Sequence, residues 1–208
     1  MSKYVLHSNS SLDEFKQLGG GKALNMARMS HLNLPVPEWF CLSTVAYDQF
    51  VDENKLEDFL NNTAGQENPE EAVCNRLTQA NVPQVVVDQI KQAINDLSLS
   101  DNFLAVRSSG LDEDSADNSF AGQFSSFLFQ KGEEQIIKSV VLCWASAFSN
   151  RAIAYRQEKG LPITDLKVGV VIQKMVDTDV SGVAFTRNVI NPLDEENLLI
   201  SSTWGLCE

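Results

Sequence analysis

The sequence has 208 residues, and 43 % of them are hydrophobic, so the chain can bury a core and does not have the composition of a disordered protein. Its formal net charge of −12 argues against a nucleic-acid binder, although a nucleotide pocket needs only a few local cations and backbone amides. There is neither an apolar run that could span a bilayer nor a secretory signal, so we expect a cytoplasmic protein.

Cysteine and histidine give no sign of a metal site. The two histidines, His7 and His31, have no pattern of carboxylates around them, and the cysteines are widely spaced with no C-x-x-C pair. We therefore expect free thiols, assign no metal ligand and assign no catalytic residue. The cysteines are Cys41, Cys74, Cys143 and Cys207.

The first hundred residues are expected to contain a glycine turn and several helices. The run at residues 19–21 opens onto a helix that ends before Pro35 and Pro37. A short strand at 39–42 follows, and Ser43 is a candidate N-cap for the next helix. Residues 55–98 are helical in pattern, with no obvious chemistry.

The character of the sequence changes near residue 101, where strands become frequent. A buried strand at 103–106 ends at Arg107, and after an acidic loop a second strand at 119–129 is interrupted by Gly122. A long helix at 133–148 continues as helix through 151–156. Three more strands are predicted, at 168–176, 182–186 and 198–202. The pattern predicts an α+β fold of mixed or antiparallel sheet with covering helices, in two parts, 1–100 and 101–208. It places Trp39, Trp144 and the phenylalanines in the core.

Two cationic motifs could bind an anion. In Gly20-Gly21-Lys22, glycines would let the backbone approach a ligand at a helix N-terminus, beside a lysine; the alternative is a plain turn with a solvated lysine. At Arg107, a strand ends with an arginine followed by two serines, which suits phosphate recognition. The alternative there is an arginine paired with Glu113 or Asp114.

Two uncharged positions also lie where a ligand could approach. Gly122 interrupts a predicted strand, which indicates either close approach of a ligand or a simple bend. Alternation along 168–173 places Gln173 near a strand end, where a cleft could open; the alternative is an ordinary edge strand.

Taken together, these motifs resemble one family, the N-terminal ATP-grasp domain of phosphoenolpyruvate synthase and pyruvate phosphate dikinase, which rifampicin phosphotransferase shares. The resemblance covers nearly the whole chain and is weakest over 55–100. The motifs that carry it include Gly20-Gly21-Lys22, Leu34-Pro35-Val36-Pro37, Ala105-Val106-Arg107-Ser108-Ser109, Ser119-Phe120-Ala121-Gly122-Gln123, Gln173-Lys174-Met175-Val176, Ser181-Gly182-Val183-Ala184-Phe185-Thr186 and Gly205-Leu206.

The resemblance implies that ATP binds with Mg²⁺ in a cleft between two subdomains. A phosphoryl group then passes to a histidine on a separate swivelling domain, and from there to a substrate. It implies that Lys22 and Arg107 contact the phosphates, and that Gly122 lets the backbone approach them with Ser126 nearby. Gln173 and backbone atoms close to residue 175 would lie near the adenine. The cofactor-binding positions are thus Lys22, Arg107, Gly122, Ser126, Gln173 and Met175.

Two positions depart from the family pattern. Ala23 and Cys207 each stand where the family has a glycine. The family's magnesium ligands and acceptor histidine lie beyond the position of Glu208. We therefore expect an N-terminal portion of a phosphotransferase, with its ATP-grasp domain incomplete at the C-terminus and inactive alone.

Three points stay open from the sequence. The final acceptor is compatible with pyruvate, an antibiotic or a biosynthetic intermediate. The alternatives for the chain as a whole are a non-catalytic nucleotide-binding or partner-binding module, and the ATP-grasp part of an ATP-dependent biosynthetic ligase. Neither nucleic acid nor membrane is expected as a partner.

Overall fold

The computed structural model describes residues 3–63, 68–111, 114–115, 118–119, 125–160, 167–188, 190–191 and 196–206. Its contacts divide the chain into two units, Met1–Met175 and Val176–Glu208, each of which is described by itself. Within the described ranges, no helix is long and apolar enough to cross a membrane.

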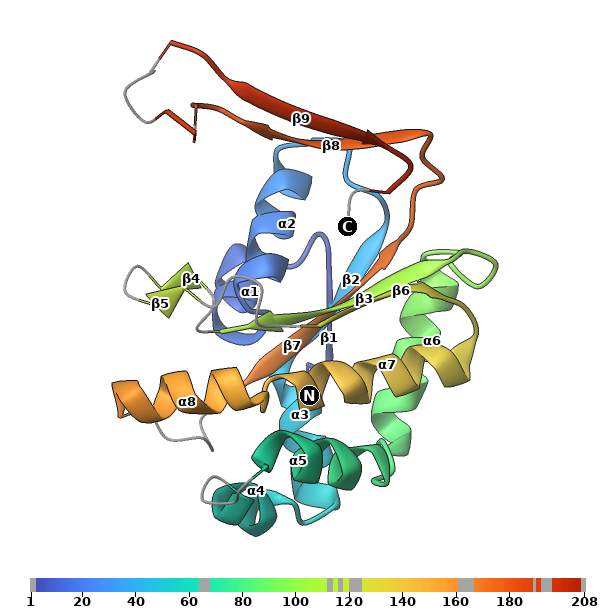
Figure 1. The fold of residues 1–208 in the computed structure, drawn as a ribbon. Coiled ribbons are helices and arrows are strands. Elements are labelled where there is room, and N and C mark those ends of the chain that lie inside the picture. The colour runs from blue at the N-terminus through green and yellow to red at the C-terminus, as the bar shows by residue number, and fades with distance from the viewer. Residues whose placement is uncertain are drawn as a thin grey trace. The chain divides into compact units, whose positions relative to one another are not determined.

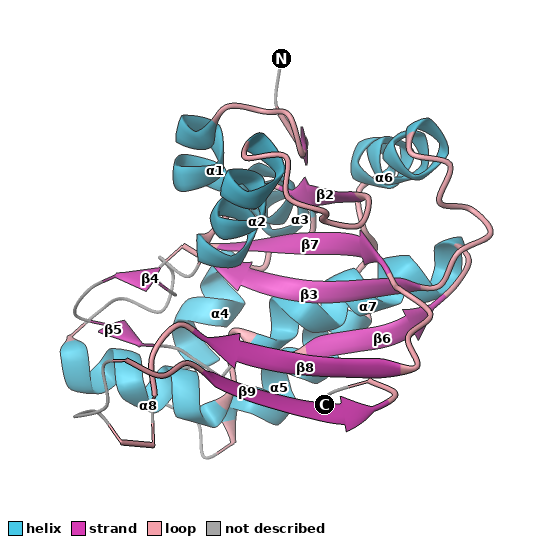
Figure 2. Cartoon of the chain, turned by 90° about the horizontal axis from the view of Figure 1, so that it is seen from above, coloured by secondary structure: helices cyan, strands magenta, loops and turns pink. Residues whose placement is uncertain are grey.

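The first unit is built on a five-stranded antiparallel sheet. The strands lie side by side in the order β1-β2-β7-β3-β6, and every neighbouring pair is antiparallel (Figures 1 and 2). The strands are β1 (Val5–His7), β2 (Trp39–Leu42), β3 (Leu104–Gly110), β6 (Ser126–Gln130) and β7 (Val168–Lys174). A small two-stranded ladder, β4 (Asp114–Ser115) with β5 (Asn118–Ser119), follows β3 in the chain.

Helices cover both faces of this sheet. Helices α1 (Leu12–Leu18) and α2 (Gly21–His31) pack on one face, and the larger helical layer lies on the other (Figures 1 and 2). That second layer contains α3 (Thr44–Glu53), α4 (Glu57–Thr63), α5 (Pro69–Thr78), α6 (Gln84–Asp96) and α7 (Glu133–Ser146). Helix α8 (Asn150–Lys159) follows α7 after a break.

Alternation along the central strands creates two separate cores. On β2, Phe40 belongs to the large core with α3–α7, whereas its neighbours Trp39 and Cys41 belong to the smaller core under α1 and α2. On β7, Val171 likewise belongs to the smaller core and Ile172 to the larger one. Strands buried on both faces are continuously apolar, which explains why β2 and β7 read as unbroken hydrophobic runs.

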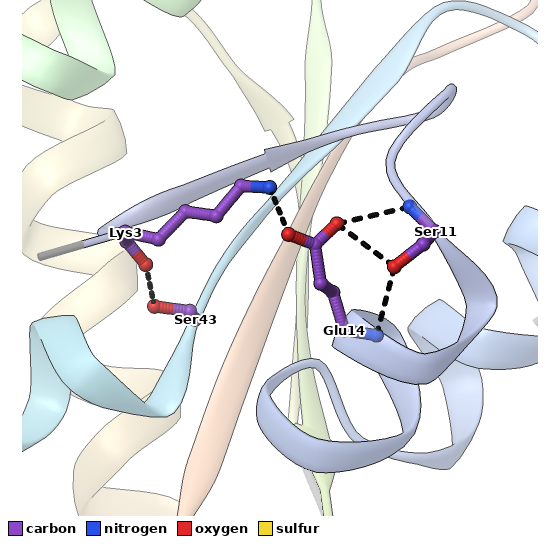
Figure 3. A network of polar contacts seen from close by, with 4 residues as sticks. All are labelled: Lys3, Ser11, Glu14 and Ser43. Carbon is purple, nitrogen blue, oxygen red and sulfur yellow. Dashed lines mark hydrogen bonds and ion pairs between the residues drawn. The ribbon is translucent and has the colours of Figure 1, made fainter. Parts of the chain in front are cut away.

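A capping box starts helix α1 and fixes it beside β1. The Ser11 hydroxyl accepts the Glu14 amide at 3.3 Å, and the Glu14 carboxylate accepts the Ser11 amide at 3.0 Å (Figure 3). The Lys3 ammonium also bonds to the Glu14 carboxylate, while the Lys3 carbonyl accepts the Ser43 hydroxyl. These contacts join the chain segment before β1 to both α1 and the start of α3.

The second unit is a two-stranded antiparallel sheet. Strand β8 (Val180–Phe185) pairs with β9 (Leu199–Trp204), and Val180 lies opposite Trp204 at the open end. The Gly205 amide donates to the Asp179 carbonyl at 2.8 Å, and the Ser181 hydroxyl donates to the Gly205 carbonyl at 2.6 Å. These bonds hold the two strands together at that open end.

The α+β combination of helices and sheets predicted from the sequence is confirmed, and every described strand pair is antiparallel. Some elements end elsewhere than predicted, and residues 120–124 of the strand predicted at 119–129 lie outside the described residues. Strand β3 runs on to Gly110 instead of ending at Arg107. Helix α7 ends at Ser146, and α8 begins as a new helix at Asn150. Ser43 is the N-cap of α3 as predicted, but its hydroxyl bonds to Lys3 and not to the helix.

The division at residue 100 stays a prediction, made from the change in sequence character there. The five-stranded sheet takes β1 and β2 from one side of residue 100 and β3, β6 and β7 from the other, and the contacts separate the units after Met175.

Among the described residues, the prediction that Trp39, Trp144 and the phenylalanines lie in the core is wrong at three positions, and Phe120 and Phe124 lie outside the described residues. The two tryptophans are buried, but Phe103, Phe129 and Phe185 are 51 %, 53 % and 40 % exposed. Phe103 and Phe129 lie at the end of the β3–β6 pair, beyond the reach of the α1–α2 layer that covers the neighbouring strands. Phe185 lies on β8, in the hairpin of the second unit.

Candidate functional site

The glycine turn before α2 is packed tightly against the ends of β3 and β7. Gly20 has φ of 81°, and a Cβ atom there would lie 2.3 Å from the Ser109 carbonyl oxygen. A Cβ atom on Gly169 of β7 would lie 2.6 Å from the Gly19 carbonyl oxygen. Close packing of backbone on backbone therefore accounts for the glycines at Gly20 and Gly169.

The same packing brings Lys22 to β3. The Lys22 ammonium donates to the Ser108 carbonyl at 2.6 Å, and the Ala23 amide donates to the Ser109 hydroxyl at 3.1 Å, although 86 residues separate the members of each pair. Ser108 and Ser109 are fully buried, and Lys22 is half-buried. A lysine ammonium has three donors, so Lys22 can bond to this carbonyl and also to a ligand.

Arg107 lies in the middle of β3, on the face that carries α2. It is directly opposite Val171 of β7 on one side and Ser126 of β6 on the other. Residues opposite one another in an antiparallel pair share a face, and Val171 belongs to the core under α1 and α2. Arg107 is half-buried and Ser126 is exposed, so both side chains border solvent at this point.

Gln173 and Met175 lie on this same face, further along β7. Gln173 is opposite Ala105 of β3 and Trp39 of β2. It lies two residues after Val171, so the two side chains are on the same face. The Met175 amide donates to the Phe103 carbonyl at 2.9 Å, which continues the ladder by another such step. Each step is about 7 Å along the strand. Gln173 and Met175 are both half-buried.

An aromatic pair stands at the far end of the face. The rings of Phe103 and Phe129 meet edge to face with centroids 6.0 Å apart, and the Lys131 ammonium lies 5.6 Å from the centroid of the Phe103 ring. The register between β3 and β6 shifts between Leu104 and Val106, so β6 carries a bulge here. At this bulge Phe129 has φ of 58°, which is rare for a bulky side chain.

Met175 supports that unusual backbone. Its sulfur accepts the Phe129 amide at 3.0 Å, so the amide freed by the bulge has a partner. Because the Met175 amide is itself bonded to Phe103, the expected adenine contact cannot use that amide without breaking a ladder bond. A backbone hydrogen bond to adenine at this position would therefore use the Met175 carbonyl or the amide of the following residue.

The buried thiols on the two faces of the sheet are poor nucleophiles. Burial raises the pKa of Cys143 on α7 to about 12, although the positive charge of Lys22 and the Ser108 backbone oppose the rise. Burial also raises the pKa of Cys41 on β2 to about 12. Only the thiolate attacks an electrophile, so these two cysteines are structural. Both are free thiols, as is Cys74, in agreement with the sequence prediction.

The structure therefore gathers five of the six predicted positions on or beside one sheet face. Lys22 lies at one end with Arg107 and Ser126, Gln173 follows, and Met175 lies at the other end. The sixth, Gly122, lies outside the described residues, as does the Glu113 alternative for Arg107. Across the described part of the chain there is no group of three or more His, Cys, Asp or Glu side chains that could hold a metal ion.

Sequence reasoning missed the aromatic pair at Phe103 and Phe129. Phenylalanine is usually buried, so nothing in composition marked these two as exposed. Alternation in Phe127-Leu128-Phe129 predicts both rings on one face, and only the shift of register in the structure turns one of them to the other face.

Comparison with known proteins places the chain in a family. A family model described as the pyruvate phosphate dikinase AMP/ATP-binding domain matches residues 16–208. A probable phosphoenolpyruvate synthase of Methanothermobacter thermautotrophicus is 32 % identical and matches 100 % of the chain but only 32 % of its own length.

Two phosphotransferases give similar matches. Rifampicin phosphotransferase of Bacillus cereus is 33 % identical over 100 % of the chain and 25 % of its own length. An uncharacterized phosphotransferase of Bacillus subtilis is 33 % identical over 94 % of the chain and 22 % of its own length. The chain thus spans between 22 % and 32 % of these three relatives. With a family model that covers residues 16–208, the chain belongs to the AMP/ATP-binding domain family of pyruvate phosphate dikinase.

Proposed function

We propose that this chain binds ATP on the α2 side of its five-stranded sheet, in an ATP-grasp arrangement. The observation that carries the proposal is the order of side chains along that face. Cations lie at one end, at Lys22 and Arg107, an amide follows at Gln173, and apolar groups lie beside Met175. An extended nucleotide has the same order, with phosphates, ribose and base.

The phosphate end has the chemistry that a triphosphate requires. Lys22 supplies a compact ammonium, and Arg107 supplies a planar guanidinium that can bind two phosphate oxygens at once. Ser126, opposite Arg107, adds a hydroxyl donor from the neighbouring strand. Concentrating these groups at one end of a face lets a chain with a net charge of −12 attract a polyanion locally.

For a full-length enzyme of this family that contains the chain, we propose phosphoryl transfer from ATP to a histidine on a separate swivelling domain, and then to a substrate. In such transfers the protein contributes mainly positioning and charge neutralisation, and these are the roles that we propose for Lys22 and Arg107. We assign Mg²⁺ ligands and the acceptor histidine to parts of the protein beyond these 208 residues. The 208-residue chain is accordingly expected to bind ATP without turning it over.

Titration calorimetry of the chain with ATP tests the proposal. Lys22→Ala and Arg107→Ala are each expected to weaken ATP binding roughly 10- to 100-fold, because each removes a charge-assisted hydrogen bond to phosphate. Arg107→Lys keeps the charge but loses the two-pronged contact, so its affinity should fall between those of Arg107→Ala and the unmodified chain.

Arg28→Ala is the matched control for charge. Arg28 is an exposed cation on the same helix as Lys22, and its guanidinium bonds to Asn25 at 3.0 Å within that helix. It should leave ATP affinity unchanged. If Lys22→Ala and Arg107→Ala bind ATP as tightly as Arg28→Ala, these residues do not form the phosphate site and the proposal fails.

A further inference from the structure

We infer that Phe129 stacks on the nucleobase of the bound nucleotide, with Phe103 and Met175 as the residues that hold its ring in place. This inference rests on the proposed function, because the phosphate end at Lys22 and Arg107 decides which way the nucleotide lies. It adds a base-binding residue at a position where the sequence predicted a core side chain.

The position of the aromatic pair suits a base. Phe103 directly precedes β3 and lies four residues before Arg107, which corresponds to about 14 Å along the sheet. Strand alternation puts both side chains on the face that carries α2, and Phe103 is paired through its carbonyl with Met175. That separation leaves room for a ribose and part of a triphosphate between the guanidinium and the rings.

The two rings have different surroundings, which decides their roles. The Lys131 ammonium lies 5.6 Å from the centroid of the Phe103 ring, so a cation already occupies a face of that ring. The Phe103–Phe129 contact is edge to face at an interplanar angle of 77°. Phe129 is 53 % exposed, so we assign stacking to its ring and support to Phe103.

The left-handed backbone conformation at Phe129 is energetically unfavourable, and packing alone does not explain it. A left-handed conformation disfavours a bulky side chain, and such outliers persist where surrounding contacts enforce them, often at ligand sites. Here the bulge in β6 and the bond from the Phe129 amide to the Met175 sulfur enforce it. The result is an aromatic ring kept at the surface and not in the core.

The Phe129 ring can be removed by a substitution that leaves the backbone conformation unchanged. In Phe129→Gly the ring is lost, but glycine adopts the left-handed conformation without strain, so the fold is retained. We expect ATP affinity to fall about tenfold, the effect typical of a lost base–aromatic stack. Phe129→Tyr keeps a π face and should restore most of the affinity that Phe129→Gly loses. Val85→Ala removes an exposed apolar side chain on α6 and is the matched control.

A second measurement follows the base directly. The fluorescent analogue ethenoadenosine triphosphate changes its emission when its base stacks on a ring, so the change on binding should be present in Phe129→Tyr and lost in Phe129→Gly. Met175→Leu keeps the size of the side chain but removes the sulfur that accepts the Phe129 amide, so it should partially reduce this emission change. If Met175 only filled space, Met175→Leu would leave the emission change unaltered.

The outcomes distinguish this inference from the proposed function. If Lys22→Ala weakens ATP binding but Phe129→Gly leaves both affinity and emission change intact, the inference is overturned and the proposed function stands. If Phe129→Gly weakens ATP and inorganic tripolyphosphate equally, the ring does not act on the base, and the inference fails as well. If the unmodified chain binds no ATP at all, the proposed function itself fails.

Discussion

Among single residues, Gly20 carries two constraints at once. Its φ of 81° disfavours any side chain, and its position would place a Cβ atom 2.3 Å from the Ser109 carbonyl oxygen. Gly132, the N-cap of α7, has the same φ of 81°, but a Cβ atom there would meet nothing within 4 Å. A side chain at Gly132 would therefore meet backbone strain alone, whereas a side chain at Gly20 would meet backbone strain and a steric clash.

We predict that Gly20→Ala lowers the free energy of unfolding much more than Gly132→Ala. The backbone term is common to both and is about 1 kcal/mol, whereas only Gly20→Ala must also move backbone atoms of Ser109. Urea denaturation of the two variants measures the difference. Equal losses of stability would mean that α2 can shift away from β3 without cost, and that Lys22 is not held against the Ser108 carbonyl.

How far the site could be predicted also depends on the kind of residue. Lys22 and Arg107 were proposed from the sequence because the motifs around them follow the order of one family, since each cation alone also fits a solvated lysine or a paired arginine. The exposed rings of Phe103 and Phe129 were not recognisable, because phenylalanine is usually buried and because a bulge in β6 changes which face the Phe129 side chain meets. Sequence periodicity assumes an unbroken strand and cannot see that change.

Among the elements, α1 has one carboxylate, that of Glu14, which both caps the helix and bonds to a lysine. The bond from the Lys3 ammonium, followed by the bonds from Ser11, lowers the pKa of Glu14 below its ordinary value of 4.5. A carboxylate whose pKa is lower in the folded state stabilises the fold above its unfolded-state pKa, and that stabilisation is lost as the pH falls through its folded-state pKa. Because the side chains of Lys3 and Glu14 are 44 % and 34 % exposed, water and salt screen this effect.

We expect Glu14→Gln to be less stable than the unmodified chain at neutral pH, with a small difference. Glutamine keeps the capping box but loses the charge that bonds to Lys3, so the difference should shrink below pH 4.5 and disappear once Glu14 is protonated in the folded chain. Denaturation curves at neutral and acid pH and at two salt concentrations measure it. A difference that persists in acid would indicate lost packing and not lost charge.

The elements that could be predicted are those whose own pattern is strong. Helix α6 has a clear apolar stripe, and β7 is a continuous apolar run, so both can be located from the sequence. Helix α1 and strand β1 are too short to show such a pattern. The order β2-β7-β3 cannot be derived either, because it joins segments that are far apart in the chain.

In the molecule as a whole, the two units differ in what holds them together. The first has two apolar cores on opposite faces of a five-stranded sheet. The second is a single hairpin, in which Val183, Phe185 and Trp204 are 45 %, 40 % and 85 % exposed. A lone two-stranded hairpin is only marginally stable in water, so the second unit has little stability of its own.

We predict that residues 1–175 fold without the hairpin. Both cores lie within this unit, so its thermal unfolding should remain a single cooperative transition with a midpoint close to that of the 208-residue chain. Circular dichroism of the shortened chain measures this. Loss of the cooperative transition would show that the hairpin contributes to the core of the first unit.

The bulge in β6 has one more consequence, for the behaviour of the protein towards other copies of itself. Strand β6 is the outer strand of the sheet, and an outer strand offers unpaired backbone groups on which a foreign strand can add. The extra residue and the left-handed turn at Phe129 break the regular spacing of those groups. At the opposite edge, β1 has only three residues. An irregular edge and a short one both discourage the sheet-to-sheet growth that leads to aggregates.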